Sequence, residues 1–454
     1  MTATLLPPGT ERGPRRWPLV GNLPAFARDP LAFFESLRDD YGDWVPWALG
    51  PQRNVLISRP EHAGELLGSV EKTFKPMELG WAFHQLLGDG VVVSTGEDWR
   101  RKRALVQPAV RPRQVRAYAA TMVECADALA RGWAEGGRID VHREMAGLTQ
   151  RIAVRTLFGS DAAGREAPIS AAMATAQREL GAEFRGLTLF LPPWVQTPGR
   201  RRMRRAVAVL DREIAYVVRE HEAASRSGGA ERDDLLSRLL AARDEQGAPL
   251  SQKELRDESI TLYIGGHETT STTLTWAWQL LSGAPEARAR LTEELDRVLG
   301  GRLPTYEDYE RLTWTRQVVK EALRVYPPVW LISAVAGEGA SIGGRPVTEG
   351  TTVWTSPWSM HRDKRWFPDP EAFRPERWSA DGAAAHAASE QAWIPFGGGP
   401  RACLGARFAL VEAALVLAVL AQRFHVDSGP TPVPVFPGLT LQPAGPVPAV
   451  LRRP

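Results

Sequence analysis

The sequence has few cysteines, little net charge and no long apolar run near its start. Two cysteines among 454 residues, Cys125 and Cys403, are too few for a disulfide framework, and they suit a reducing compartment. A net charge of +3 is small for this length, so nothing in the composition demands a nucleic-acid partner. The segment Met1 to Pro24 has no apolar run long enough for a transmembrane helix or a signal peptide. We interpret this segment as an extended leader without a membrane anchor and expect a cytoplasmic protein.

The chain shows no internal repeat, no low-complexity linker and no shift in composition that would mark a domain boundary. Its 24% charged and 43% hydrophobic residues are ordinary for a globular protein with a large core. Helical periodicity dominates, and we predict a single domain over residues 1–454 that is mainly α (α+β class) with a small β-sheet. The strand-like runs are Trp44–Leu49, Asn54–Ser58, Thr352–Ser356, Leu439–Gln442 and Ala449–Arg452.

The strongest helix signal runs from Ser251 to about Ser282. Ser251 and Glu254 have the spacing of a capping box, and the segment Gly283-Ala284-Pro285 ends the pattern. About thirty residues at about 1.5 Å each predict a helix of roughly 45 Å, which is long enough to cross a domain. We expect the core to be organised around this helix.

Two adjacent glycines, Gly265 and Gly266, lie near the middle of this predicted helix. Each costs roughly 1 kcal/mol relative to alanine, so their presence favours a groove where a small ligand approaches the backbone. Glu268 and Thr269 follow within one turn and could relay protons to such a ligand. The alternative interpretation is a helix kink at the glycines. His267 lies nearly opposite Thr269 on the helix, and we expect it to be a hydrogen-bonded structural histidine.

The segment Phe396–Gly405 places Cys403 in a glycine-rich turn directly before an apolar helical run, Ala406 to Phe424. A thiolate there lies at the positive end of a helix dipole with backbone amides directed at its sulfur, which suits a sulfur ligand to iron. Phe396 would shield the sulfur from water, and Arg401 would meet a carboxylate on the rim of a cofactor. The alternative is a glycine-rich turn around a buried free cysteine.

These ten residues resemble the haem-ligand loop of the cytochrome P450 family, whose pattern is Phe-x-x-Gly-x-Arg-x-Cys-x-Gly. Every fixed position of the pattern is present. The resemblance implies that Cys403 binds the iron of haem b. Gly399 and Gly405 can adopt backbone angles closed to other residues, and they would leave room for a flat macrocycle.

The segment Gly265 to Thr270 also resembles a motif of this family, Ala/Gly-Gly-x-Asp/Glu-Thr-Thr/Ser. The resemblance implies that Thr269 hydrogen-bonds bound O2 and that Glu268 gates the delivery of protons from solvent. Gly265 is then expected to lie against the cofactor.

Glu321 and Arg324 are one helical turn apart and are suited to an ion pair. They resemble the Glu-x-x-Arg motif of the family, in which the pair is locked to an arginine of a later Pro-Glu-Arg segment. Arg377 occupies that position here. The resemblance implies that the three residues fix the cysteine loop during folding and take no part in catalysis.

Trp99 and Arg103 are spaced so that both can point inward from a helix, while Arg100, Arg101 and Lys102 stay largely outside. By resemblance, Trp99 and Arg103 bind the haem propionates. The three outward residues could help to dock an acidic redox protein.

The chain departs from the family at Ser333-Ala334-Val335, where a basic residue commonly reaches a propionate. Haem anchoring would therefore depend more on Trp99, Arg103 and Arg401.

The resemblances imply a haem-thiolate monooxygenase that inserts one oxygen atom from O2 into a hydrophobic small molecule. We expect a monomer that receives electrons from a separate ferredoxin and ferredoxin reductase, since no flavin or iron–sulfur module is visible. The alternatives are a peroxide-driven peroxygenase, a redox-neutral isomerase or dehydratase, and a non-enzymatic haem sensor. Glu268 and Thr269 favour O2 activation over a peroxygenase and over an isomerase or dehydratase. A sensor would be expected to carry a DNA-binding or signalling module, and none is visible.

By resemblance, apolar side chains from several stretches line the substrate pocket. Their lack of fixed charge suits a terpenoid, fatty acid or polyketide, and we favour a terpenoid or similar lipid-like molecule. The basic cluster Arg200–Arg205 is interpreted as a solvated helix start. The expected pocket residues are Trp81, Phe83, Leu86, Leu87, Val91, Phe184, Leu189, Phe190, Leu262, Ile264, Trp330, Ile332 and Phe436.

Overall fold

The structure is a computed structural model, and it describes residues 12–78, 80–159, 166–185, 191–192, 194–226, 234–380, 382 and 387–454. These residues fall into two compact units, which we describe separately. Unit 1 comprises Met1–Met77 and Lys320–Cys403, and unit 2 comprises Glu78–Val319 and Leu404–Pro454. The expectation of a single domain stays a prediction.

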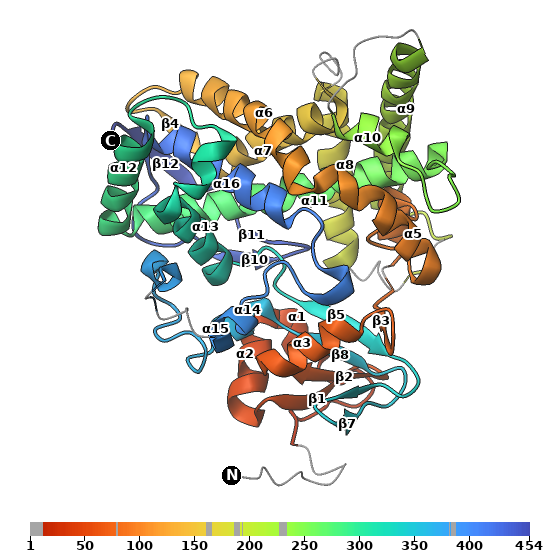
Figure 1. The fold of residues 1–454 in the computed structure, drawn as a ribbon. Helices are drawn as coiled ribbons and strands as arrows, with labels where there is room; N and C mark the ends of the chain where they lie inside the picture. The colour runs from red at the N-terminus through yellow and green to blue at the C-terminus, as the bar shows by residue number, and fades with distance from the viewer. Residues whose placement is uncertain are drawn as a thin grey trace. The chain divides into compact units, whose positions relative to one another are not determined.

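Unit 1 is built on a five-stranded sheet of order β1-β2-β8-β5-β3 (Figure 1). The β2–β8 pair is parallel, and the other neighbours are antiparallel. The predicted runs at 44–49, 54–58 and 352–356 correspond to β1, β2 and β8. The strands are β1 (Trp44–Leu49), β2 (Gln52–Ile57), β3 (Phe74–Pro76), β5 (Ile332–Ala336) and β8 (Thr352–Thr355), beside a small pair, β6 (Ser341–Ile342) and β7 (Arg345–Pro346).

Helix α2 shows how the sequence builds the core of unit 1. Asp29 caps the helix by accepting hydrogen bonds from the backbone N–H groups of Leu31 and Ala32, at 3.1 and 3.0 Å. The helix buries Phe33 and Phe34 against Trp47 of β1, with ring centroids 5.3 and 5.6 Å away. The helices of unit 1 are α1 (Leu23–Arg28), α2 (Pro30–Tyr41), α3 (Pro60–Ser69), α14 (Pro357–His361), η5 (Pro375–Trp378), α15 (Ala387–Ala392) and η6 (Gly399–Arg401).

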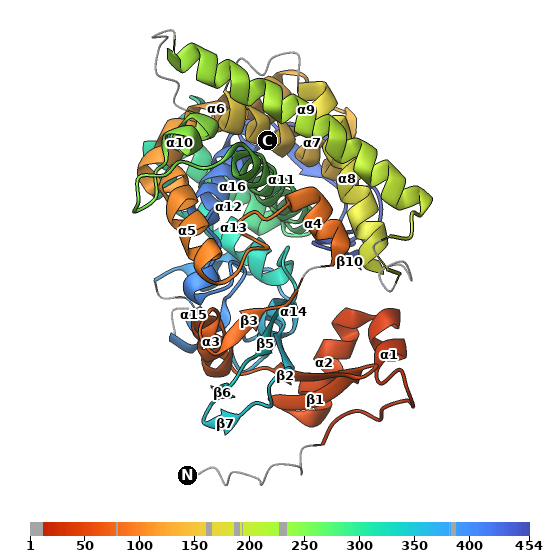
Figure 2. The same cartoon turned by 90° about the vertical axis from the view of Figure 1, so that its right-hand side faces the viewer.

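Unit 2 is helical, with two small sheets of order β4-β12-β9 and β10-β11. Helix α7 packs along α11, and α8 and α9 lie side by side (Figures 1 and 2). The strands are β4 (Arg138–Asp140), β9 (His425–Asp427), β10 (Val435–Pro437), β11 (Leu441–Pro443) and β12 (Pro448–Arg452). The helices are α4 (Trp81–Leu87), α5 (Gly96–Val106), η1 (Gln107–Val110), α6 (Pro112–Arg131), α7 (Val141–Phe158), α8 (Glu166–Arg185), α9 (Pro198–Arg226), α10 (Leu235–Ala241), α11 (Gln252–Ser282), α12 (Pro285–Leu299), η4 (Tyr306–Glu310) and α16 (Ala406–Ala421), while α13 (Thr313–Val325) starts in unit 2 and ends in unit 1.

Helix α11 is the predicted long helix, and it extends over 31 residues without interruption at the two glycines. Its capping box is formed as expected, since Ser251 accepts from the Glu254 backbone and Glu254 accepts from the Ser251 backbone. Two of its buried hydroxyls bond within the helix, since Thr272 and Thr275 donate to carbonyls four residues earlier, at 2.9 and 2.7 Å. Hydrogen bonds of this kind lower the cost of burying polar side chains on the helix.

The prediction of a mainly α protein with a small β-sheet component is confirmed. Cys125 is fully buried on α6. Within the described ranges, no helix combines the length and apolar character needed to cross a membrane.

Candidate active site

The cysteine loop of unit 1 is a closed turn that presents Cys403. The backbone N–H of Cys403 donates to the carbonyl of Phe396 at 2.9 Å, and the thiol side chain is exposed. Gly399 has φ +62°, and a Cβ atom there would lie 2.0 Å from the carbonyl oxygen of Leu67 on α3. Contact with α3 therefore requires this glycine, which is a reason that the sequence did not reveal. Gly405 has φ −88°, which any residue can adopt, so the expectation of a backbone angle closed to other residues is wrong for this glycine. A Cβ there would meet nothing within 4 Å, and its contact with a cofactor stays a prediction.

The side chains beside the cysteine are held by neighbours in unit 1. Phe396 packs edge-on against Trp393, with ring centroids 6.0 Å apart. Arg401 forms an ion pair with Glu71, whose Oε1 lies 2.8 Å from Nε and 2.5 Å from Nη2. A guanidinium carries five N–H donors, so this pair is compatible with the expected contact between Arg401 and a cofactor carboxylate.

Glu321, Arg324 and Arg377 come together in unit 1, as the resemblance implied. The ion pair between Glu321 and Arg324 is completely buried, with an O–N distance of 2.8 Å. Nε of Arg377 lies 3.0 Å from the same carboxyl group. Two further donors complete the site: the backbone N–H of Arg374 at 3.0 Å and Nε1 of Trp378 at 2.8 Å. Every lone-pair direction of a buried carboxylate is thereby used, which stabilises the charge.

This network reaches the cysteine loop through His361, which sequence reasoning missed. Nη1 of Arg324 donates to the His361 carbonyl at 3.0 Å, and Nδ1 of His361 lies 3.1 Å from the Arg324 carbonyl. Nε2 of His361 accepts from the backbone N–H of Ile394 at 3.1 Å. Burial lowers the pKa of His361 to about 3, so the ring is neutral and can accept this bond. The carbonyl of Ile394 in turn accepts from Gly397, inside the loop.

One face of α11 in unit 2 is open at the two glycines. A Cβ at Gly265 or Gly266 would meet nothing within 4 Å, and Thr269 on the same face is half-buried. The hydroxyl of Thr269 donates to the carbonyl of Gly265 at 2.7 Å. His267 is buried elsewhere on the helix and stacks on Tyr263, and burial lowers its pKa to about 4. The open face carries a hydroxyl next to exposed backbone, and the structural role expected of His267 stays a prediction.

Glu268 is held by three neutral donors. Its Oε1 accepts from Oγ1 of Thr440 at 2.6 Å and from Nε2 of Gln442 at 2.7 Å. Its Oε2 accepts from Nε2 of Gln177 on α8 at 2.9 Å. Burial raises the pKa of Glu268, and the three hydrogen bonds oppose that rise. Sequence reasoning found the acid but none of its partners.

Trp99 and Arg103 lie together on α5, with the guanidinium 5.7 Å from the centroid of the indole ring. Trp99 is buried and Arg103 is half-buried, and their contact with propionates stays a prediction.

Arg101 and Lys102 were expected to stay largely outside. The expectation is wrong for Lys102, which is buried, and Arg101 is only partly exposed. Lys102 is 3% exposed, because Nζ is bound by the Asp89 carbonyl at 2.7 Å and by Asp98 at 2.6 Å. Arg101 is half-buried and pairs with Asp244 at 2.7 Å and with Glu254 at 2.6 Å. Arg100 is exposed as expected.

The solvated character expected of the cluster Arg200–Arg205 is wrong for its first member. Arg200 is 2% exposed and pairs with Glu183 at 2.5 Å, and it also donates to the carbonyls of Pro192 and Val195. Its guanidinium lies 4.9 Å from the ring centroid of Trp81. This arginine therefore joins α4, α8 and the start of α9.

The expected pocket residues have different surroundings in each unit, and their contact with a substrate stays a prediction. In unit 1, Trp330 is buried with its ring 6.4 Å from Phe34, and Ile332 is half-buried on β5. The side chain of Phe184 lies outside the described residues, as do Leu189 and Phe190. In unit 2, the buried members are Phe83, Leu86, Leu87 and Val91, and the half-buried ones are Trp81, Leu262, Ile264 and Phe436.

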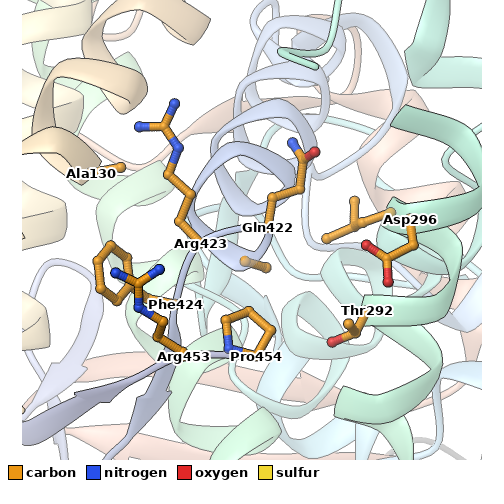
Figure 3. A pocket seen from close by; sticks show the side chains of 10 residues that line it. Ala130, Thr292, Asp296, Gln422, Arg423, Phe424, Arg453 and Pro454 are labelled. Carbon is orange, nitrogen blue, oxygen red and sulfur yellow. The ribbon is translucent and has the colours of Figure 1, made fainter. Parts of the chain in front are cut away.

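A surface pocket of about 590 Å³ lies elsewhere in unit 2. Figure 3 shows Thr292 and Asp296 of α12 on one side, with Gln422 and Arg423 beyond the end of α16 on another. None of the predicted site residues lines this pocket, so it has no part in the chemistry considered below.

Each unit taken by itself suits a flat iron cofactor. Unit 1 offers an exposed thiol in a turn whose conformation is fixed by α3. Unit 2 offers an open helix face at Gly265 and Gly266, beside the hydroxyl of Thr269. The residues present therefore fit haem.

The comparisons with known proteins agree with this chemistry. The family model Cytochrome P450 matches residues 12–447. The chain is 36% identical over 446 residues to cyclooctatin synthase of Streptomyces melanosporofaciens, covering 95% of this chain and 93% of that protein. It is 37% identical over 431 residues to cyclooctat-9-en-7-ol 5-monooxygenase of the same organism, covering 93% and 90%. It is 34% identical over 423 residues to pentalenene oxygenase of Streptomyces avermitilis, covering 91% and 90%.

Proposed function

The chain belongs to the cytochrome P450 family and is a monooxygenase that uses haem b and O2, and we propose that its substrate is a terpenoid. Two of the relatives carry names that refer to cyclooctat-9-en-7-ol and to pentalenene, both terpenoids. The observation in this chain that carries the proposal is the open face of α11, where half-buried Leu262 precedes Gly265 and Thr269. A face with an apolar side chain, bare backbone and a hydroxyl suits a largely apolar molecule.

Cys403 would hold the haem iron, which requires the thiol to lose its proton. When bound, the haem supplies the activation of O2. Trp99, Arg103 and Arg401 would hold its propionates. Their buried or half-buried positions support this assignment.

Thr269 and Glu268 would handle protons on α11. The hydroxyl of Thr269 lies on the open face and can both donate and accept a hydrogen bond. Glu268 is buried, and burial raises its pKa, which favours an acid that can hold a proton and release it.

Electrons would come from a separate ferredoxin and ferredoxin reductase, and the enzyme would act as a monomer. Exposed Arg100 on α5 is a basic group that an acidic ferredoxin could contact.

The first experiment is an optical titration of the ferric protein with terpenes, fatty acids, macrolides and aromatic acids. We expect a shift from low to high spin with a terpene or terpene alcohol, followed by product formation with NAD(P)H and a surrogate ferredoxin system. A spin shift and turnover with fatty acids or macrolides, but with no terpenoid, would overturn the substrate proposal. Product formed only with added peroxide would favour a peroxygenase.

A further inference from the structure

We propose that Gln177, Thr440 and Gln442 act as positioning residues for Glu268, the acid that precedes Thr269 on α11. The proposal rests on the function proposed above, because it concerns how that monooxygenase handles protons. All four residues belong to unit 2.

Strand β11 and the residue before it supply two of the three donors. Thr440 and Gln442 are two positions apart, so their side chains point to the same side, and both donate to Oε1 of Glu268. The residue between them is anchored to α11, because Nε1 of Trp276 donates to the Leu441 carbonyl at 2.8 Å. This hydrogen bond fixes the position of the β10–β11 hairpin along α11. It thereby sets the direction in which Thr440 and Gln442 donate.

Helix α8 supplies the third donor from a separate element. Nε2 of Gln177 donates to Oε2 of Glu268, so each carboxyl oxygen has its own partner. A carboxyl held at both oxygens cannot rotate about its last bond without losing a hydrogen bond. The buried carboxyl is thus kept in one orientation.

The chemistry of these donors allows the acid to change its charge. A cationic partner would stabilise only the carboxylate, whereas hydroxyl and carboxamide groups can each donate or accept. The hydroxyl of Thr440 can reverse its hydrogen bond when Glu268 is protonated, and a carboxamide can turn its oxygen toward an O–H group. No Lys or Arg within the described ranges forms an ion pair with Glu268, and its neighbour His267 is neutral at physiological pH. These neutral partners therefore fix the position of Glu268 and leave its protonation state adjustable.

The test follows the protonation of Glu268 by infrared spectroscopy of the purified haem protein. The carbonyl band of the protonated acid is identified by its loss in Glu268→Gln, and its intensity is titrated with pH. Thr440→Val and Gln442→Leu each remove a donor to the carboxylate, so we expect the midpoint to rise by about one pH unit. Gln442→Lys supplies a cation and should lower it. Thr440→Ser keeps the hydroxyl and should restore the parent midpoint.

The matched controls are Thr275→Val and Gln279→Leu, which remove a buried hydroxyl and a buried amide from α11 without touching the Glu268 carboxyl. We expect both to titrate like the parent. The proposal is overturned if Thr440→Val and Gln442→Leu also titrate like the parent, or if the controls shift equally. The reduced carbon monoxide spectrum confirms that each variant is folded with haem. Because the titration needs no substrate, it stands even if the terpenoid proposal fails.

Discussion

Glu321 in unit 1 and Glu268 in unit 2 are both buried glutamates, but their partners differ in kind. Glu321 is ion-paired with two guanidinium groups, those of Arg324 and Arg377. Glu268 accepts hydrogen bonds from two carboxamides and one hydroxyl. Charged partners commit a carboxyl group to one state and make it a structural anchor, whereas neutral partners let it exchange a proton. The surroundings of a buried acid, more than its burial, therefore decide what it can do.

We expect the largest effect from replacing Cys403, the proposed iron ligand, because this change removes the ligand and leaves the Glu321 network in place. Cys403→Ser should abolish the thiolate-type absorption of the reduced carbon monoxide complex, because a hydroxyl replaces the sulfur ligand. It should leave the Glu321 network intact, since no atom of that network belongs to Cys403. Retention of the thiolate signal in this variant would show that the ligand is misassigned.

Breaking the charged anchor should cost stability. Arg324→Ala leaves the Glu321 carboxyl buried beside a single guanidinium, and we expect a loss of about 3–5 kcal/mol in the free energy of unfolding. The matched control is Arg374→Ala, which removes a half-exposed guanidinium paired with Asp369 and should cost less than about 1 kcal/mol. Urea unfolding of the three proteins measures both values. Equal losses of unfolding free energy in Arg324→Ala and Arg374→Ala would contradict the role of the Glu321 network as a structural anchor.

Replacing Glu268, whose hydrogen-bond partners are all neutral, should lower the rate of product formation. Glu268→Gln keeps the shape of the side chain but cannot release a proton, so we expect product formation to fall by roughly 10²–10⁴-fold. More of the NAD(P)H electrons should appear as hydrogen peroxide. The unfolding midpoint in urea should change little, in contrast to Arg324→Ala. Unchanged product formation would remove Glu268 from the proton path.

Glu258 on α11 is another buried glutamate. It has fewer hydrogen-bond partners than Glu321 or Glu268. Its Oε2 accepts from the backbone N–H of Val91 at 3.2 Å, and burial raises its pKa from 4.5 to about 7. Between these two values the unfolded chain releases the proton and the folded chain retains it. The contribution of Glu258 to stability is therefore lost as pH rises through this window and does not change further above it.

Glu258→Gln removes this titration. Relative to the parent, the variant should gain stability between pH 5 and pH 8, by up to about 3 kcal/mol. Urea unfolding at the two pH values measures the gain. The same difference between variant and parent at both values would show that Glu258 does not titrate in this range.

Features set by local pattern could be predicted from the sequence. The capping box at Ser251 and Glu254 and the stop at Gly283 fixed both ends of α11 correctly. The strand at 44–49 was predicted with its observed bounds, because a short continuous apolar run is followed by Gly50-Pro51 at a tight turn. The partner Arg377 of Glu321 was found only because the resemblance supplied a second motif.

Features set by distant partners could not be predicted. Lys102 and Arg200 stand in basic runs, which normally indicate a solvated surface, yet carboxylates and carbonyls elsewhere in the chain bury both. Gln177 and Gln442 have no local signature, because their role depends on meeting Glu268 from 91 and 174 positions away. A single sequence does not show which polar side chain will lie opposite a buried acid.

The spacing of these partners also allows the two sites to form in a definite order during synthesis. The side chains that bind Glu321 follow it within 57 positions, so this anchor can close soon after that stretch leaves the ribosome. The donors to Glu268 include Thr440 and Gln442, which lie 172 and 174 positions later, near the end of the chain. Synthesis therefore allows Glu321 to meet its partners before Glu268 has any partner on β11.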